Sequence, residues 1–211
     1  TSTVDVTLNL DGVPEYHIHE NVAWDYISFN DAIAQRVAEA DIICFGSLAQ
    51  RSSTSRQSLE KILSRCKEDT LVVYDINLRQ SYYSREIIEK SLQLCNVLKL
   101  NEDELPVVSE LLKLSSPDDE AQIIELIKKY HLQLVAFTRG SEGSLLVTPT
   151  EKSEIPTPKV KVKDTVGAGD SFTAAMMVGF ANGQSLHELH QKAVEISAFV
   201  CTSDGAMPDY K

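Results

Sequence analysis

The sequence contains little cysteine, little positive charge and no long hydrophobic run. Its four cysteines form no Cys-x-x-Cys pair, which argues against a disulfide framework or a zinc site. No stretch of about 18 apolar residues is present, so we expect no transmembrane helix. Lys and Arg number 20 against 31 Asp and Glu, a net charge of −11, so we expect neither nucleic acid nor a membrane as partner. These features predict a cytoplasmic protein with reduced thiols.

The remaining composition is that of a globular protein with one main domain. Hydrophobic residues make up 43% and charged residues 24% of the 211 residues, enough to bury a core without disulfide bonds. The chain begins at Thr1 rather than Met, and no secretory signal follows. We therefore expect the natural protein to begin upstream of Thr1.

Residues 1–22 have the alternating pattern of a β-hairpin. Apolar and polar residues alternate from Val4 to Leu10, Asp11-Gly12 predicts a turn, and the alternation resumes over 15–19. A hairpin of this size is only marginally stable alone, so it must lie on another surface. Its unpaired strand edges predict a symmetric homodimer with a seam near Val4, Val6 and Ile18.

From Asn30 onward, helical and strand patterns alternate. We predict helices at 31–40, 53–66, 84–94, 117–130, 168–181 and 185–203. Short apolar strands are predicted at 42–45, 71–74, 97–100, 134–137 and 144–148. The helix at 117–130 is expected to have Ser116 as its N-cap and Pro117 as its first residue. This alternation predicts an α/β fold, in which helices cover both faces of a mostly parallel sheet.

Polar clusters follow four of the predicted strands. In such sheets, ligands bind at the carboxyl ends of the strands. The clusters are Gly46-Ser47, 75–79, 101–104 and 138–143. Each alone is explained by turn formation and helix capping, but four at one edge of a sheet indicate a binding site.

The segment 164–172 is the most informative stretch. Gly167, Ala168 and Gly169 are small residues at the start of an apolar helix, where backbone N–H groups lack partners and can hold an anion. Asp170 follows them, and a carboxylate beside bound phosphate suits the removal of a proton from an attacking hydroxyl. The alternative is that Asp170 is an N-cap and that the two glycines serve a turn.

Other phosphate-binding motifs are missing. No Gly-x-x-x-x-Gly-Lys-[Ser/Thr] sequence occurs, which excludes a P-loop enzyme. Phe172 occupies the position of the third glycine of Gly-x-Gly-x-x-Gly, which disfavours a dinucleotide-dependent oxidoreductase. The His-Arg-Asp and Asp-Phe-Gly motifs of protein kinases do not occur either.

Four motifs together resemble the PfkB (ribokinase-like) carbohydrate kinases. The segment 164–170 looks like the second signature of that family, and 101–104 is similar to its Asn-x-x-Glu motif. The segment 138–143 resembles its nucleotide-contacting Thr-x-Gly-x-x-Gly loop, and 75–79 resembles Asp-x-Asn-x-Arg of the sugar-kinase branch. The resemblance implies a ribokinase-like three-layer α/β/α fold with a small β lid. Residues 1–22 would be the lid, and 23–211 the nucleotide-binding and catalytic part of a domain whose N-terminal part is missing.

The resemblance also implies roles for individual residues. Asp170 would be the general base, and the N–H groups of Gly167, Ala168 and Gly169 would stabilise the transferring phosphoryl group. Glu104 would hold Mg²⁺ through water, and Asp164, with the loop 203–206, would hold K⁺. Contacts to the nucleotide and its phosphates would come from Arg79, Asn101, Thr138, Gly140, Gly143 and Thr165.

We therefore expect an ATP-dependent kinase that phosphorylates a hydroxyl of a small sugar. The segments 16–20 and 22–25 resemble the lid of the fructokinase branch, which favours fructose. Ribose and 2-keto-3-deoxygluconate are alternative substrates, because kinases for these sugars share the phosphoryl-transfer residues. A nucleotide- or sugar-binding protein without catalysis is the alternative of a different class.

Overall fold

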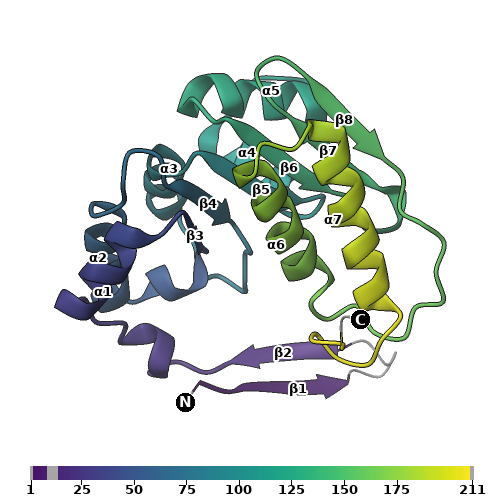
Figure 1. Ribbon diagram of the computed structural model, residues 1–211. Helices are drawn as coiled ribbons and strands as arrows, with labels where there is room; N and C mark the ends of the chain where they lie inside the picture. The colour runs from purple at the N-terminus through teal and green to yellow at the C-terminus, as the bar shows by residue number, and fades with distance from the viewer. Residues whose placement is uncertain (1, 9–13, 210–211) are drawn as a thin grey trace.

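The computed structural model describes residues 2–8 and 14–209, which form two sheets and surrounding helices (Figure 1). β1 (Val4–Leu8) and β2 (Pro14–Ile18) pair antiparallel, with Val4 opposite Ile18. The turn predicted at Asp11-Gly12 and the strand end predicted at Leu10 lie outside the described residues. Figure 1 shows this small sheet outside the main sheet, beneath the body of the molecule.

The main sheet has six strands, and four of them are parallel. Their spatial order is β3 (Ile42–Phe45), β4 (Leu71–Asp75), β5 (Val97–Asn101), β6 (Leu134–Thr138), β7 (Ser144–Val147) and β8 (Lys152–Ile155). β3 to β6 run parallel, whereas β7 and β8 are added antiparallel. β8 was not predicted. In this short edge strand only Ser153 and Ile155 are buried, and they alternate with the exposed charged residues Lys152 and Glu154, so the strand has no apolar run. The predicted mostly parallel sheet is confirmed.

Helices cover both faces of this sheet, as predicted. They are α1 (Asp31–Glu39), α2 (Ser53–Leu63), α3 (Arg85–Leu94), α4 (Glu104–Leu112), α5 (Asp119–Tyr130), α6 (Ala168–Ala181) and α7 (Leu186–Cys201). Side chains of α2, α3, α4 and α5 share one core with Tyr74 and Leu98 of the sheet. Side chains of α6 and α7 share a second core with Val73 and Val97, which point to the opposite face. None of the helices in the described ranges is long and apolar enough to cross a bilayer.

The start of α5 lies two residues after its predicted position, and α4 was not predicted. α5 begins at Asp119, and its N-cap is Asp118, whose Oδ1 accepts the N–H of Ala121 at 2.9 Å. Ser116, predicted as N-cap, instead donates its N–H and hydroxyl to Glu125 Oε2, at 3.2 Å and 2.8 Å. α4 was not predicted at all, because its first turn lies within the polar cluster 101–104 and contains Pro106. Proline is tolerated there, since first-turn N–H groups have no helical acceptor.

A buried histidine joins α7 to the two antiparallel strands. His190 is fully buried, and its Nε2 and Nδ1 atoms lie 2.8 Å and 2.9 Å from the hydroxyls of Ser144 and Ser153. Burial lowers the pKa of His190 to about 4, so the ring is neutral at pH 7. Both ring nitrogens therefore have polar partners inside the core.

Candidate active site

The predicted polar clusters come together at the carboxyl edge of the parallel strands. Asp75 ends β4, Asn101 ends β5 and Thr138 ends β6. The strand register places Asn101 beside Thr138. The first turns of α6 lie at the same region, because Gly169 lies near Lys99 and Thr173 bonds to Asp75. The sequence prediction that these clusters share one sheet edge is confirmed.

α6 begins at a glycine that no other residue can replace without strain. Gly167 is the N-cap and has a φ of 82°, in the left-handed region. A β-carbon at this position would lie 2.7 to 2.9 Å from atoms of Ala206. The alternative in which Asp170 is the N-cap is wrong, because Asp170 is the third residue of the helix and is exposed. Its carboxylate is therefore open to a ligand.

The first turn of α6 has part of the expected anion cradle. The N–H of Ala168 donates to the carbonyl of Thr165 at 3.2 Å, so it closes a turn instead of pointing outward. Within residues 2–8 and 14–209, no acceptor is recorded for the N–H groups of Gly169 and Asp170. These two donors carry the positive end of the helix dipole. Together with the predicted N–H of Gly167, to which the described residues give no acceptor either, they are the groups of this turn that can hold an anion.

A buried lysine beneath this turn was missed in the sequence. Lys99 lies in the middle of β5, and its Nζ atom is 3.3 Å from Asp75 Oδ1. A β-carbon built on Gly169 would lie 3.5 Å from the same Nζ atom. The hydroxyl of Thr173, on α6, donates to Asp75 Oδ2 at 2.9 Å. Lysine in an otherwise apolar strand was the available signal, because an unpaired buried charge is rarely tolerated.

The electrostatics of this ion pair place a cation beneath the helix start. Lys99 and Asp75 are 7% and 8% exposed. Burial raises the pKa of Asp75, and the Lys99 ammonium and the Thr173 hydroxyl act in the opposite direction. The pair connects the sheet edge to the helix that carries Asp170. It therefore fixes the position of the first turn of α6 relative to β4 and β5.

Glu104 is buried and joins two loops. Its Oε1 accepts the N–H of Leu78 and its Oε2 accepts the N–H of Asn101, both at 2.9 Å. Asn101 Oδ1 accepts the N–H groups of Asp103 and Glu104 in return. Burial raises the pKa of Glu104, and the two N–H donors oppose this. Glu104 thus ties the turn after β5 to the loop that carries Arg79.

The loop 138–143 is held tightly by its two glycines. Gly140 has a φ of 47°, and its carbonyl accepts the hydroxyl of Thr157 at 2.6 Å. Gly143 has a φ of 117°, and a β-carbon there would lie 2.5 Å from the carbonyl oxygen of Ile155. Position 143 therefore requires glycine, whereas the left-handed backbone of Gly140 favours it. The loop lies beside the Asn101 turn, because the N–H of Glu102 donates to the Thr138 carbonyl at 3.0 Å.

Asp164 and Arg79 lie at the margins of this region. Asp164 accepts the N–H groups of Val166 and Gly205, at 3.0 Å and 3.1 Å, which lowers its pKa. It thereby joins the start of α6 to the loop 203–206. Arg79 is exposed and donates to the carbonyl of its neighbour Leu78 at 3.0 Å. The Arg79 guanidinium is thus turned back onto its own loop.

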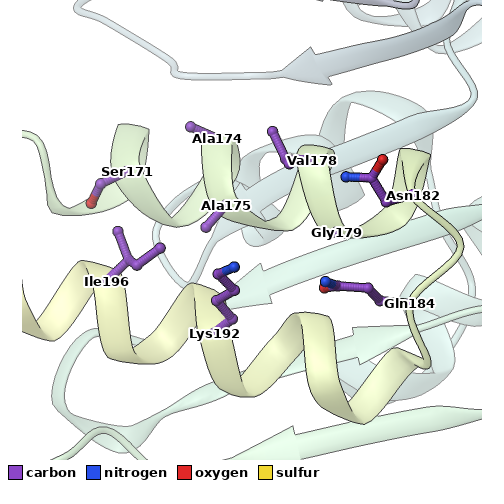
Figure 2. Close-up of a pocket in the computed structure, with 9 residues that line it drawn as sticks. All are labelled: Ser171, Ala174, Ala175, Val178, Gly179, Asn182, Gln184, Lys192 and Ile196. Atoms are coloured by element: carbon purple, nitrogen blue, oxygen red, sulfur yellow. The ribbon is translucent and has the colours of Figure 1, made fainter.

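A separate pocket lies between α6 and α7, and Figure 2 shows its lining side chains. It has a volume of about 400 Å³. Ala174, Val178 and Ile196 provide apolar surface, and Lys192 and Gln184 also line it. None of the predicted site residues lines it.

Comparisons with known proteins show the family and the fold of this chain. Residues 19–211 match the family model described as pfkB family carbohydrate kinase. A sugar kinase of Pyrococcus horikoshii, described as uncharacterized, is 28% identical over 201 residues, which are 92% of this chain and 60% of that protein. A fructokinase of Escherichia coli is 26% identical over 220 residues, which are 98% of this chain and 69% of that protein.

Solved structures share the fold. The Pyrococcus horikoshii sugar kinase in complex with ATP has a TM-score of 0.81 at 27% identity, over 98% of this chain and 66% of that chain. A ribokinase from Thermotoga maritima has a TM-score of 0.72 at 22% identity, over 98% of this chain and 65% of that chain. The predicted ribokinase-like fold is confirmed. The chain spans between three fifths and seven tenths of the length of these proteins.

Proposed function

Because this chain belongs to the PfkB family of carbohydrate kinases, we propose that it carries the nucleotide-binding and catalytic part of an ATP-dependent sugar kinase. In this proposal residues 1–22 are the lid and 23–211 form the catalytic part. The observation that carries the proposal is the exposed Asp170 beside two N–H donors at the start of α6, above the buried Lys99–Asp75 pair. Pure binding of phosphate needs no carboxylate there, which disfavours a binding protein without catalysis.

Asp170 acts as the general base. It accepts the proton of a sugar hydroxyl while that oxygen forms a bond to the terminal phosphorus of ATP, and the bond from that phosphorus to the ADP oxygen breaks. Gly167, Ala168 and Gly169 supply the helix start. The N–H groups of Gly169 and Asp170 donate to the oxygens of the phosphoryl group while it is transferred. Ala168 joins them only if its 3.2 Å bond to Thr165 opens when the phosphate binds.

The nucleotide lies along the same sheet edge in this proposal. Thr138, Gly140 and Gly143 form its loop, with Asn101 and Thr165 nearby. Arg79 turns from the Leu78 carbonyl to a phosphate, to which its planar guanidinium can donate two bonds.

The described residues fit a magnesium ion that is held chiefly by the nucleotide. They contain no group of three or more His, Cys, Asp or Glu residues that could hold a metal ion. Mg²⁺ keeps several waters and commonly binds through one or two carboxylates together with substrate phosphates. Glu104 would be that carboxylate, reached through water, because both of its oxygens already accept N–H groups. The ion would neutralise charge on the phosphates.

Three further parts of the proposal concern potassium, substrate and setting. Asp164 and the loop 203–206 would hold K⁺, supported by the Asp164 bond to Gly205.

Fructose is the favoured sugar, supported by fructokinases among the relatives, and ribose and 2-keto-3-deoxygluconate are the alternatives. A panel of these sugars with an ADP-release assay distinguishes them. ATP as substrate and four unpaired cysteines support a cytoplasmic setting.

The test of the function is Asp170→Asn in the full-length protein. This variant keeps the size of the side chain and the N–H groups of the turn but loses the base. We expect turnover to fall by about 10² to 10⁴-fold, with nucleotide affinity unchanged. The matched control is Asp119→Asn, which changes an acidic residue in the first turn of α5 and leaves turnover unchanged. Retained turnover in Asp170→Asn removes this residue from the proposed role, and tight ATP binding without any turnover in the wild type favours the binding protein.

A further inference from the structure

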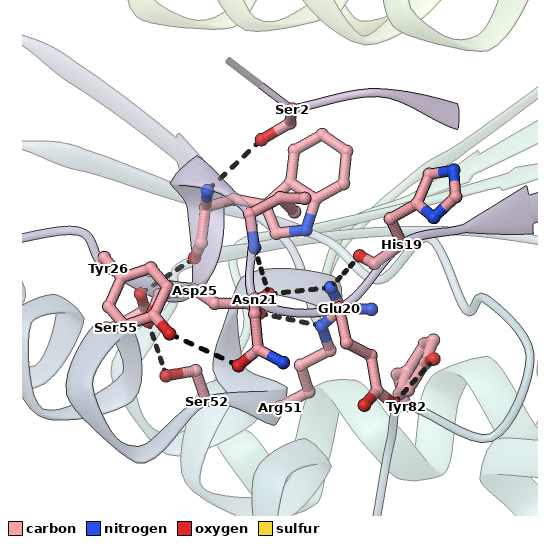
Figure 3. A network of polar contacts seen from close by, with 12 residues as sticks. Ser2, His19, Glu20, Asn21, Asp25, Tyr26, Arg51, Ser52, Ser55 and Tyr82 are labelled. Atoms are coloured by element: carbon pink, nitrogen blue, oxygen red, sulfur yellow. Dashed lines mark hydrogen bonds and ion pairs between the residues drawn. The ribbon is translucent and has the colours of Figure 1, made fainter. Parts of the chain in front are cut away.

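Arg51 is a buried cation that contacts segments from three parts of the chain. It ends the short helix η2 (Leu48–Arg51), and its side chain is 8% exposed. Its Nε and Nη2 atoms donate to the two carboxylate oxygens of Asp25, each at 2.8 Å. Nη2 also donates to the carbonyl of His19, and the guanidinium lies 4.3 Å from the centre of the Tyr82 ring. Figure 3 shows these contacts converging on one side chain.

Breaking the ion pair between Arg51 and Asp25 would lower the stability of the fold. Asp25 is 6% exposed, and the Arg51 guanidinium lowers its pKa despite the opposing effect of burial. Removing one partner of a buried ion pair leaves an unpaired charge away from water. Arg51 Nη1 is also buried, and the described residues give it no hydrogen-bond partner. A role in packing alone does not explain why a cation is held in a position where its burial is unfavourable.

The contacts of Arg51 join the lid to the loop after β4. His19 directly follows β2, and Asp25 ends the short helix η1 (Ala23–Asp25). On the other side, the N–H of Tyr82 donates to the carbonyl of Arg79 at 3.1 Å, so Tyr82 closes the turn that carries Arg79. The hydroxyl of Tyr82 donates to Glu20 at 2.9 Å, which is a second link between the two segments.

Other bonds hold the segment near Asp25 to α2 without Arg51. Ser52 donates its hydroxyl to the carbonyl of Asp25 at 2.6 Å, and Ser55 donates its hydroxyl to the carbonyl of Trp24 at 2.8 Å. Arg51 is therefore not the sole attachment of this segment to the body. What Arg51 adds is a fixed position of the end of β2 relative to the Arg79 turn.

We propose that Arg51 is a positioning residue that couples the base of the lid to the Arg79 turn. The lid would cover the sugar and Arg79 would contact a phosphate, so the consequence for catalysis rests on the proposed function. Through Arg51 and Tyr82 the two move as one unit. Loss of Arg51 lets the lid move independently and weakens sugar binding more than it slows phosphoryl transfer.

The first test is hydrogen exchange, which requires no activity. In Arg51→Met we expect exchange of the backbone N–H groups of Asp25 and Tyr26 to rise by roughly 10-fold or more, while those of β4 and β5 stay unchanged. Tyr82→Ala should raise exchange at the same positions, since it removes the stacked ring and the Glu20 bond. Arg36→Met is the matched control, because Arg36 lies on α1 and its side chain is 87% exposed.

The second test is sugar kinetics of the full-length protein. In Arg51→Met we expect KM for the sugar to rise about 10-fold with kcat changed less than about 3-fold. Equal acceleration of exchange in β4 and β5 would mean a general loss of stability and overturns the proposal. So does unchanged exchange near Asp25 in Tyr82→Ala, or an unchanged KM for the sugar in Arg51→Met. Absence of sugar turnover in the wild type overturns the proposed function instead, and the exchange data still decide whether Arg51 couples the two segments.

Discussion

At the scale of single residues, Gly167 and Gly169 have different reasons to be glycine. Gly167 needs a positive φ and approaches Ala206, whereas a β-carbon on Gly169 would make only an ordinary contact with Lys99. We expect Gly167→Ala to lower the free energy of unfolding by about 2 kcal/mol or more. Gly169→Ala should be as stable as the wild type, because alanine is the better helix former. Urea denaturation of both variants measures this difference.

The variants Gly167→Ala and Gly169→Ala also distinguish an effect on folding from an effect on catalysis. If phosphate must approach the Gly169 N–H closely, Gly169→Ala loses turnover in the full-length protein while its unfolding curve stays unchanged. Normal turnover in Gly169→Ala would contradict a close approach at this residue. Gly183→Ala provides the control for positive φ alone, because its φ is 68° and nothing lies within 4 Å of the added carbon.

Lys99 provides the second prediction at this scale. Lys99→Met leaves the Asp75 carboxylate buried without its cation, and we expect a loss of about 3 kcal/mol or more in the free energy of unfolding. Adding Asp75→Asn removes the unpaired charge, so the double variant should recover part of that loss. Chemical denaturation at pH 7 measures both variants. A double variant that is no more stable than Lys99→Met would show that charge pairing is not the cause.

At the scale of elements, the attachment of α7 should depend on pH through His190. Burial lowers the pKa of His190 from 6.5 to about 4, so between these values the unfolded chain binds a proton that the folded chain does not. This residue therefore decreases stability as pH falls from about 6.5 to 4, by up to about 1.4 kcal/mol per pH unit. We expect His190→Leu to be less stable at pH 7, because the hydroxyls of Ser144 and Ser153 lose a partner. Its stability should depend less on pH over this range.

Denaturation curves at pH 7, 6, 5 and 4 test this prediction. The matched control is His187→Gln, since His187 is an exposed histidine on the same helix. It should retain most of the wild-type pH dependence. Parallel pH profiles for the wild type and His190→Leu would rule out His190 as the source.

At the scale of the whole molecule, we propose a homodimer formed through the lid. Val4 is 41% exposed on β1, which fits a seam between two copies. Ile18, predicted to share this seam, is only 5% exposed, so that part of the prediction is wrong: Ile18 packs within its own chain. The side chain of Val6 lies outside the described side chains. Val4 lies opposite Ile18 and so on the same face of the small sheet, which Ile18 packs against its own chain, so the seam would instead follow the outer edge of β1 near Val4.

Light scattering on the full-length protein tests this interface. We expect a dimer that dissociates in Val4→Lys, because an ammonium group at an apolar seam loses its hydration. Val178→Lys is the control, since Val178 is 54% exposed and lies on α6, outside the lid. A monomeric wild type contradicts the homodimer, and a dimer that survives Val4→Lys moves the interface elsewhere.

The sequence alone determined the strands other than β8, their mostly parallel arrangement and the edge at which Asp75, Asn101 and Thr138 meet. Those features follow from local periodicity and from the chain direction of parallel strands, which neighbours in sequence encode. It also located the start of α6, because the small residues Gly167, Ala168 and Gly169 come directly before an apolar helical run. Only the tertiary structure decided that Lys99 pairs with Asp75 beneath Gly169, and that Arg51 joins Asp25 to Tyr82. Residues 24 to 31 positions apart in the chain make these contacts, and no local pattern carries the distance between them. The choice of Asp118 over Ser116 as N-cap has the same origin, since Glu125, nine residues on, takes the Ser116 hydroxyl for another bond.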